Sequence, residues 1–286
     1  MVADGQSLLL FAVKAAFTAA ALVSIGFSLH AMLGVTPAVR TRSGVQLVAT
    51  AAGVTVALML ARLALLNAQL GGSASAAFDA SFFAWTWTAL GPSAIATMLG
   101  CIAGILAAVF GNRWFAGAAA GLLAAGFALT GHAAAMEQPL LASTIAALHV
   151  LIAGFWIVAP HSLYPSSNTP DEDLHRRLVR FSRYAGLLVP LMFAMGFWLA
   201  WTLAGGLQPL FGSLYGGLLL VKLAAAVLAL ALGAVNQRFL TRMLLAQPER
   251  GRRWLRRTLL VDAVLFAVAI IAISAATTLT GPPADS

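Results

Sequence analysis

The run LLLFAVKAAFTAAALVSIGFSLHAML, residues 8–33, is apolar apart from Lys14, His30 and a few hydroxyl side chains. Its length exceeds the ~20 residues with which an α-helix crosses the hydrocarbon core of a bilayer. It is too long for the apolar core of a secretory signal peptide, and no basic segment precedes it. The run therefore predicts a retained transmembrane helix, which places the chain among integral membrane proteins.

Seven further apolar runs of comparable length follow along the chain. They cover residues 45–67, 92–111, 114–131, 140–160, 184–205, 214–240 and 257–280. The whole sequence is 61% hydrophobic and only 9% charged, whereas soluble domains carry about 25% charged residues. The sequence predicts an all-α integral membrane protein, a bundle of eight transmembrane helices that forms a single domain over residues 1–286.

The basic residues indicate how the bundle is oriented. Fourteen of the 17 Lys and Arg residues fall in four short connectors, namely Arg40 and Arg42; Arg113; Arg176, Arg177, Arg180 and Arg183; and Arg238 through Arg257. Basic connectors face the cytoplasm in membrane proteins. We therefore expect residues 161–183 and 238–257 to be cytoplasmic loops, and eight alternating spans then put both termini on the outer side.

The net charge of +8 could also indicate a nucleic-acid partner. Because the positive charge is confined to alternate connectors, it instead reports orientation, and anionic membrane lipid is the expected partner. A nucleic-acid partner is not expected.

The connector at residues 71–91 lies on the predicted outer side. It contains Asp79, followed by FFAWTW at residues 82–87. Aromatic side chains of this kind are typical of the head-group level of a bilayer. We expect an interfacial connector here, either a short interfacial helix or a re-entrant cover.

Three small-residue pairs are spaced four residues apart: Gly100 with Gly104, Gly117 with Gly121, and Gly212 with Gly216. Close backbone approach drives helix association in lipid, so these pairs predict packing faces between helices.

Three basic residues, Lys14, Arg62 and Lys222, fall inside apolar runs, in the predicted outer halves of their helices. Long cationic side chains can extend to the interface. Alternatively, the three cations line a polar cavity or pair with Asp79 or Glu137. A further charge, Asp262, is expected to pair with Arg256 or Arg257 and to be structural.

Two histidines, His132 and His149, are the main candidates for a functional site. His132 ends the fourth run and His149 lies within the fifth. An ionisable side chain inside a membrane span is energetically costly, so it usually marks a functional site. Met136 and Glu137 lie between them, and Met195 lies on the sixth run. Imidazole and thioether ligands together select copper, above all Cu(I). We therefore predict a copper site from His132, His149, Met136, Glu137 and Met195, with the two histidines at different depths as successive stations.

Two other function classes stay open at this point. A helical bundle can hold haem between facing histidines, as in electron-transfer proteins. Alternatively, the protein is a receptor that docks a copper carrier at the outer face without moving the metal. An enzyme is not expected, since no nucleophile–base pairing, phosphate loop or soluble catalytic domain is apparent.

Several short motifs resemble those of the bacterial copper-resistance protein D (CopD) family. They are Thr130-Gly131-His132-Ala133, Leu148-His149, Phe155-Trp156, Arg180-Phe181-Ser182, Tyr215-Gly216 with Leu218 through Leu223, Asn236, and Thr280-Gly281-Pro282-Pro283. The resemblance covers at least residues 126–283, and the motifs follow one another in the order and spacing of that family.

The resemblance implies an eight-helix protein of the bacterial inner membrane that imports copper, as Cu(I) or Cu(II). It also implies a periplasmic copper-binding partner similar to CopC, which we expect to be a separate chain. It gives functional weight to His132, His149 and Lys222, and more loosely to Asn236.

Overall fold

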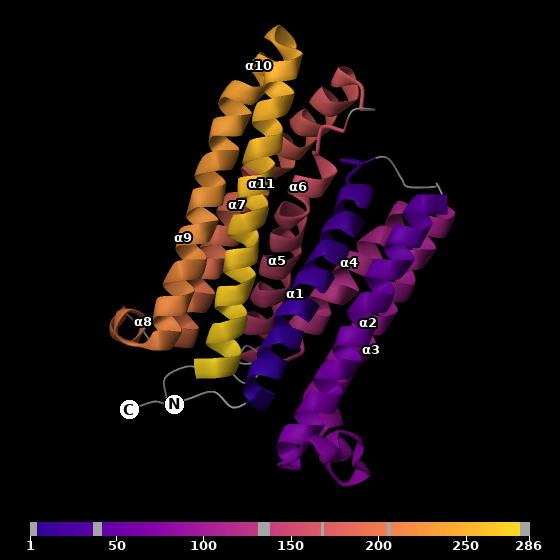
Figure 1. Cartoon of the computed structure of the whole chain (residues 1–286), viewed down its shortest axis with the longest axis vertical. Coiled ribbons are helices and arrows are strands. Elements are labelled where there is room, and N and C mark those ends of the chain that lie inside the picture. The colour runs from indigo at the N-terminus through magenta and orange to yellow at the C-terminus, as the bar shows by residue number, and fades with distance from the viewer. Residues whose placement is uncertain (1–4, 37–41, 131–137, 167–168, 205–206, 281–286) are drawn as a thin grey trace.

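The computed structural model describes residues 5–36, 42–130, 138–166, 169–204 and 207–280. Within these ranges every regular element is helical (Figure 1). The elements are α1 (Gly5–Met32), α2 (Arg42–Leu70), η1 (Ala74–Phe78), α3 (Ala80–Phe110), α4 (Arg113–Ala128), α5 (Pro139–Ile157), α6 (Ala159–Ser162), α7 (Asp171–Ala204), α8 (Leu207–Gly212), α9 (Leu214–Val235), η3 (Asn236–Leu240), α10 (Thr241–Ala246), α11 (Pro248–Ala275) and η4 (Ala276–Thr280). The 3₁₀ element is η1, and η3 and η4 are π-helical turns.

The prediction of a helical membrane protein is confirmed. Seven helical stretches of the described chain are long and apolar enough to cross a bilayer; they contain α1, α2, α3, α5, α7, α9 and α11. The remaining predicted span, residues 114–131, corresponds to α4, which is apolar but has only 16 residues. At 1.5 Å per residue α4 is about 24 Å long, shorter than the ~30 Å hydrocarbon core.

Helix α1 lies at the centre of the bundle. It packs against α2, α4, α5 and α11, so it joins the two sides that Figure 1 shows, α2–α4 on one and α5, α7, α9 and α11 on the other. Within these sides α3 packs on both α2 and α4, α9 packs on α11, and α5 packs on α7. Residues far apart in the sequence therefore meet along α1.

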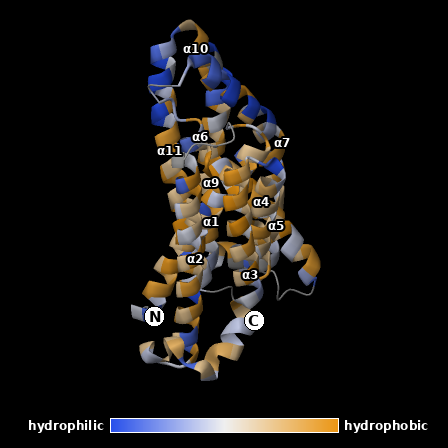
Figure 2. Ribbon diagram, turned by 90° about the vertical axis from the view of Figure 1, so that its right-hand side faces the viewer, coloured by the Kyte–Doolittle hydropathy of each residue, from blue (hydrophilic) through white to orange (hydrophobic). Residues whose placement is uncertain are grey.

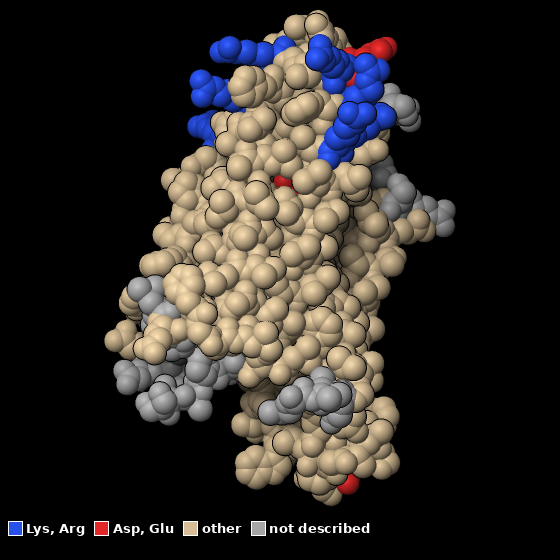
Figure 3. All heavy atoms as spheres, turned by 60° about the vertical axis from the view of Figure 1, so that its left-hand side comes forward, with Lys and Arg blue, Asp and Glu red and all other residues tan. Residues whose placement is uncertain are grey.

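The polar residues gather at one end of the bundle. Figure 2 shows a hydrophilic end around α10 and an apolar middle, and Figure 3 shows Lys and Arg side chains at that same end on the face in view. We call it the arginine-rich end. Helix α1 begins, and the α11–η4 stretch finishes, at the opposite end (Figure 1).

The basic segments at the arginine-rich end are more helical than expected. Helix α7 begins at Asp171 and α11 at Pro248, so much of 161–183 and 238–257 extends the apolar helices instead of forming loops. The first turn of α7 carries Asp171, Glu172 and Asp173. Carboxylates near a helix N-terminus interact favourably with its dipole, which helps to extend α7 beyond its apolar part.

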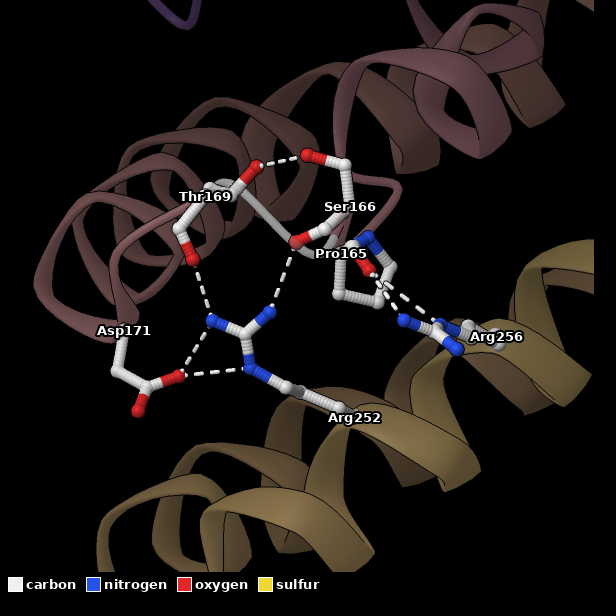
Figure 4. A network of polar contacts seen from close by, with 6 residues as sticks. All are labelled: Pro165, Ser166, Thr169, Asp171, Arg252 and Arg256. Carbon is white, nitrogen blue, oxygen red and sulfur yellow. Dashed lines mark hydrogen bonds and ion pairs between the residues drawn. The ribbon is translucent and has the colours of Figure 1, made fainter.

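One arginine joins the two basic segments. Arg252 of α11 donates from Nε to Asp171 Oδ1 at 2.8 Å and from Nη1 to the carbonyl of Ser166 at 3.0 Å, and Nη2 bonds the carbonyl of Thr169 (Figure 4). Arg252 Nη2 also lies 2.7 Å from Asp171 Oδ1. The guanidinium group thereby fixes the start of α11 against the segment that leads into α7.

The expected connector at 71–91 is shorter in the structure. Helix α3 begins at Ala80, so the aromatic cluster forms its first turns, and η1 occupies Ala74–Phe78. Asp79 caps α3: its Oδ1 accepts a hydrogen bond from the Ser81 amide at 2.9 Å. This bond lowers the pKa of the exposed Asp79 carboxyl. Asp79 is thus a helix cap, and the helix it starts explains why the connector ends early.

Asn67, near the end of α2, holds this connector in place. Its buried Nδ2 donates to the carbonyl oxygens of Ala76 at 2.8 Å and Asp79 at 2.9 Å, and its Oδ1 accepts from Thr86 Oγ1 at 2.8 Å. One amide therefore ties α2, η1 and α3 together.

Replacing this amide is expected to destabilise the protein. Asn67→Leu should lower the free energy of unfolding by about 2–3 kcal/mol, because the buried carbonyls and the Thr86 hydroxyl lose their partner. The thermal midpoint of the detergent-solubilised protein should fall by about 5 °C or more. Gln69→Leu, which removes an exposed amide two residues further along α2, is the control. Equal midpoints for both variants would contradict this role of Asn67.

Candidate functional site

A cavity of about 580 Å³ lies among α1, α2, α5, α7, α9 and α11, with further lining from α3 and α4. Among the described residues, the lysine, arginine and histidine side chains that line it are Lys14, Arg62, His149 and Lys222. Each of these four side chains is partly exposed. The structure thus brings the three intramembrane cations and one of the two predicted histidines to a single cavity, which supports the polar-cavity interpretation of the cations.

His149 is positioned by a backbone carbonyl of the neighbouring helix. It lies about 15 Å along α5 from Pro139. Its Nδ1 is 3.1 Å from the carbonyl oxygen of Met192 on α7. A carbonyl can only accept, so Nδ1 carries the proton and a neutral ring keeps its free lone pair on Nε2. Histidines that bind metals are oriented in this way, with the other ring nitrogen donating to a carbonyl or carboxylate.

Gly196 makes room for this imidazole. It lies one turn after Met192 on α7, and a Cβ at position 196 would come within 2.9 Å of His149 Cε1. Any larger residue would displace the ring. Gly196 is a site residue that the sequence does not single out, because its importance depends on where α5 packs.

The cations have no carboxylate partner among the described residues. Lys14 Nζ donates to the carbonyl of Thr277 at 3.2 Å. The Arg62 guanidinium lies 4.6 Å from the centre of the Phe17 ring, a cation–π contact. Lys14 is close enough to Arg62, and His149 to Lys222, for electrostatic interaction. Asp79, one of the two predicted partners, caps α3 instead.

The other predicted residues lie elsewhere. Met195 is buried in the apolar core of the bundle, whereas Met192 both joins this core and lines the cavity. Asn236 belongs to η3, where its Oδ1 accepts from Trp254 Nε1 at 3.2 Å, so it links α9 to α11. His132, Met136 and Glu137 lie outside the described residues.

The described residues contain no group of three or more His, Cys, Asp or Glu side chains that could hold a metal ion. His149 is also the one histidine among the described residues that line the cavity. In this part of the chain the cavity therefore offers a single imidazole, and neither a closed metal cage nor a facing pair of histidines for haem.

Residues 175–276 match the family model described as copper resistance protein D. The copper transport protein CutJ of Bacillus subtilis (strain 168) is 30% identical to this chain over 161 residues. The segment 175–276, about a third of the chain, is thus similar to the copper resistance protein D family. The aligned residues make up 54% of this chain and 28% of that relative. No solved structure matches the chain.

The CopD match covers the half of the cavity that α7, α9 and α11 provide. Met192, Gly196 and Lys222 fall within it. His149, Lys14 and Arg62 come from α5, α1 and α2, before the matched segment. The cavity is thus built from both the matched segment and the helices that precede it.

Proposed function

We propose that the protein is a copper permease of the bacterial inner membrane, which moves copper from the periplasm to the cytoplasm. The observation that carries this proposal is the oriented imidazole of His149, whose Nε2 is free for a metal inside a cavity of the membrane bundle. The similarity to the copper resistance protein D family and to a copper transport protein supports copper as that metal.

In this proposal copper is received by His132 with Met136 or Glu137 and passed to His149. Met192 of α7, which lines the cavity, then relays it inward. Thioether and neutral imidazole ligands suit Cu(I). Each station must bind weakly enough to release the ion.

The neighbouring cations contribute to this weak binding. Like charges repel more strongly inside a protein than in water, because the effective dielectric constant there is lower. A copper ion on His149 would be repelled by Lys222, which shortens its stay. The arrangement therefore favours transient binding over storage.

The charge pattern supports an orientation with the arginine-rich end in the cytoplasm and both termini in the periplasm, with α4 as the eighth span. The outer end would then receive copper from a separate CopC-like carrier. This orientation puts the His149 cavity in the outer half of the bundle, where an incoming ion arrives first.

The experiment is a measurement of cell-associated copper. Cells that express His149→Ala or His132→Ala should accumulate about fivefold less protein-dependent copper than cells that express the wild type, because loss of a metal ligand typically costs tenfold or more in affinity. His161→Ala removes an exposed imidazole that packs against Phe27 and serves as the control. Equal accumulation in all strains, at equal protein levels, would contradict the permease proposal.

The cation-lined cavity also favours a second candidate, a receptor that docks a copper carrier without moving the metal, because positive charge opposes the passage of a bare cation. Liposomes that contain the purified protein and an internal copper indicator separate the two functions. A permease produces a signal inside the liposome that depends on His149. A receptor binds copper outside and produces none.

A further inference from the structure

We propose that the cavity among α1, α2, α5, α7, α9 and α11 binds an organic monoanion, with its charged group between Lys14, Arg62 and Lys222 and its apolar body along the cavity wall. A carboxylate on a short alkyl or aryl chain is the ligand class. This site goes beyond copper handling and needs no bound metal.

The first argument is charge. Three cationic side chains reach one cavity, and no carboxylate of the described chain lines it. Cationic groups within a membrane bundle are costly unless they are paired or hydrated. The contacts that Lys14 and Arg62 make, with a carbonyl and an aromatic ring, provide dipoles but no negative charge. A bound anion supplies it.

The second argument is the shape and chemistry of the wall. The cavity encloses about 580 Å³, which lies within the range of pockets for small organic ligands and far above the ~30 Å³ of one water molecule. Most of its lining is apolar, for example Phe17, Leu90, Trp156, Leu219 and Phe266. A halide would leave this surface uncovered, whereas an alkyl or aryl body would cover it.

The third argument is the position of the polar groups. Tyr215 and Ser274, which carry hydroxyl groups, also line the cavity, and the buried Ser274 hydroxyl has no hydrogen-bond partner among the described residues. Carboxylates bind most strongly where charged donors and hydroxyl donors converge. The cavity therefore offers donors for a head group as well as a wall for its body.

The test is equilibrium binding of radiolabelled octanoate to the copper-free protein in phosphatidylcholine nanodiscs. We expect a saturable component that unlabelled octanoate displaces, and that octanol and chloride at the same concentration do not. Lys222→Met and Arg62→Met should each weaken it about tenfold, because a hydrogen bond to a charged group contributes about 1.5–3 kcal/mol. Arg257→Met, which removes an exposed charge outside the cavity, should leave it unchanged.

Each outcome bears on the proposal. The absence of a saturable component, or an equal one in Lys222→Met and Arg62→Met variants that elute as folded protein, would overturn it. Displacement by chloride would show that charge alone is recognised and would overturn the organic ligand class. Since no copper is present, this result is independent of whether the protein is a permease.

Discussion

Gly154→Leu is expected to abolish most of the folded protein. Gly154 of α5 faces α1, and a Cβ at this position would come within 2.6 Å of Ile25 Cγ2 and 3.0 Å of the Leu22 carbonyl oxygen. Gly26 of α1 faces it in turn, since a Cβ there would come within 2.2 Å of the Gly154 carbonyl oxygen. These two glycines allow the backbones of α1 and α5 to approach closely, which is the main source of helix affinity in lipid.

A leucine at 154 must push α1 and α5 apart, and α1 also contacts α2, α4 and α11. Overpacking of this kind costs typically 1–3 kcal/mol and more where backbone must move. We expect the monodisperse peak in fluorescence-detected size exclusion to fall to about a tenth of the wild-type height. Gly186→Leu on α7, where a side chain would meet nothing within 4 Å, is the control. Equal peaks for the two variants would contradict the close contact.

Gly196→Val is expected to lower copper accumulation as much as His149→Ala does, about fivefold, while the protein remains folded. The valine side chain would occupy the space of the His149 ring, whose Cε1 lies 2.9 Å from the position of a Cβ at 196. The ring would then lose its hydrogen bond to Met192 and the orientation of Nε2. This prediction depends on the proposed permease function and is measured in the same cells.

The double variant tests whether Gly196 acts through His149. If it does, Gly196→Val combined with His149→Ala accumulates no less copper than either single variant, since a double-mutant cycle reports coupling between residues in contact. Gly186→Val, on the same helix without a neighbour within 4 Å, is the matched control. Two independent, additive losses would show that Gly196 does not act by placing the imidazole.

Features that depend on the composition of a single helix could be predicted from the sequence. Apolar runs identify membrane helices because lipid penalises every unsatisfied polar group, and this prediction held for seven stretches of the described chain. Lys14, Arg62 and Lys222 stood out for the same reason, and the structure places all three at one cavity.

Features that depend on contacts between helices were not predictable. Gly26 and Gly154 belong to none of the expected glycine pairs, and they matter because α1 meets α5 there. Among the expected pairs, Gly100 does face α4, since a Cβ would come within 2.8 Å of Leu123 Cγ, whereas Gly121 meets nothing within 4 Å. A four-residue spacing therefore indicates a possible packing face without identifying its partner.

The expected pairing of Asp262 was wrong. Its Oδ1 is buried without a partner among the described residues. Arg256 instead donates from Nε and Nη2 to the Pro165 carbonyl. A prediction from side-chain charges alone leaves out backbone acceptors. At the arginine-rich end, arginine side chains donate to several backbone carbonyl groups.

Arg252 has two separate roles, one during membrane insertion and one in the folded protein. The insertion machinery counts positive charges near the ends of a span, and for that purpose lysine and arginine are equivalent. The folded protein uses the planar fork of donors, which reaches Asp171 and two carbonyls in different directions. A lysine offers one point charge and cannot reproduce this geometry. Arg252→Lys would therefore preserve the topology signal while separating α11 from the segment before α7.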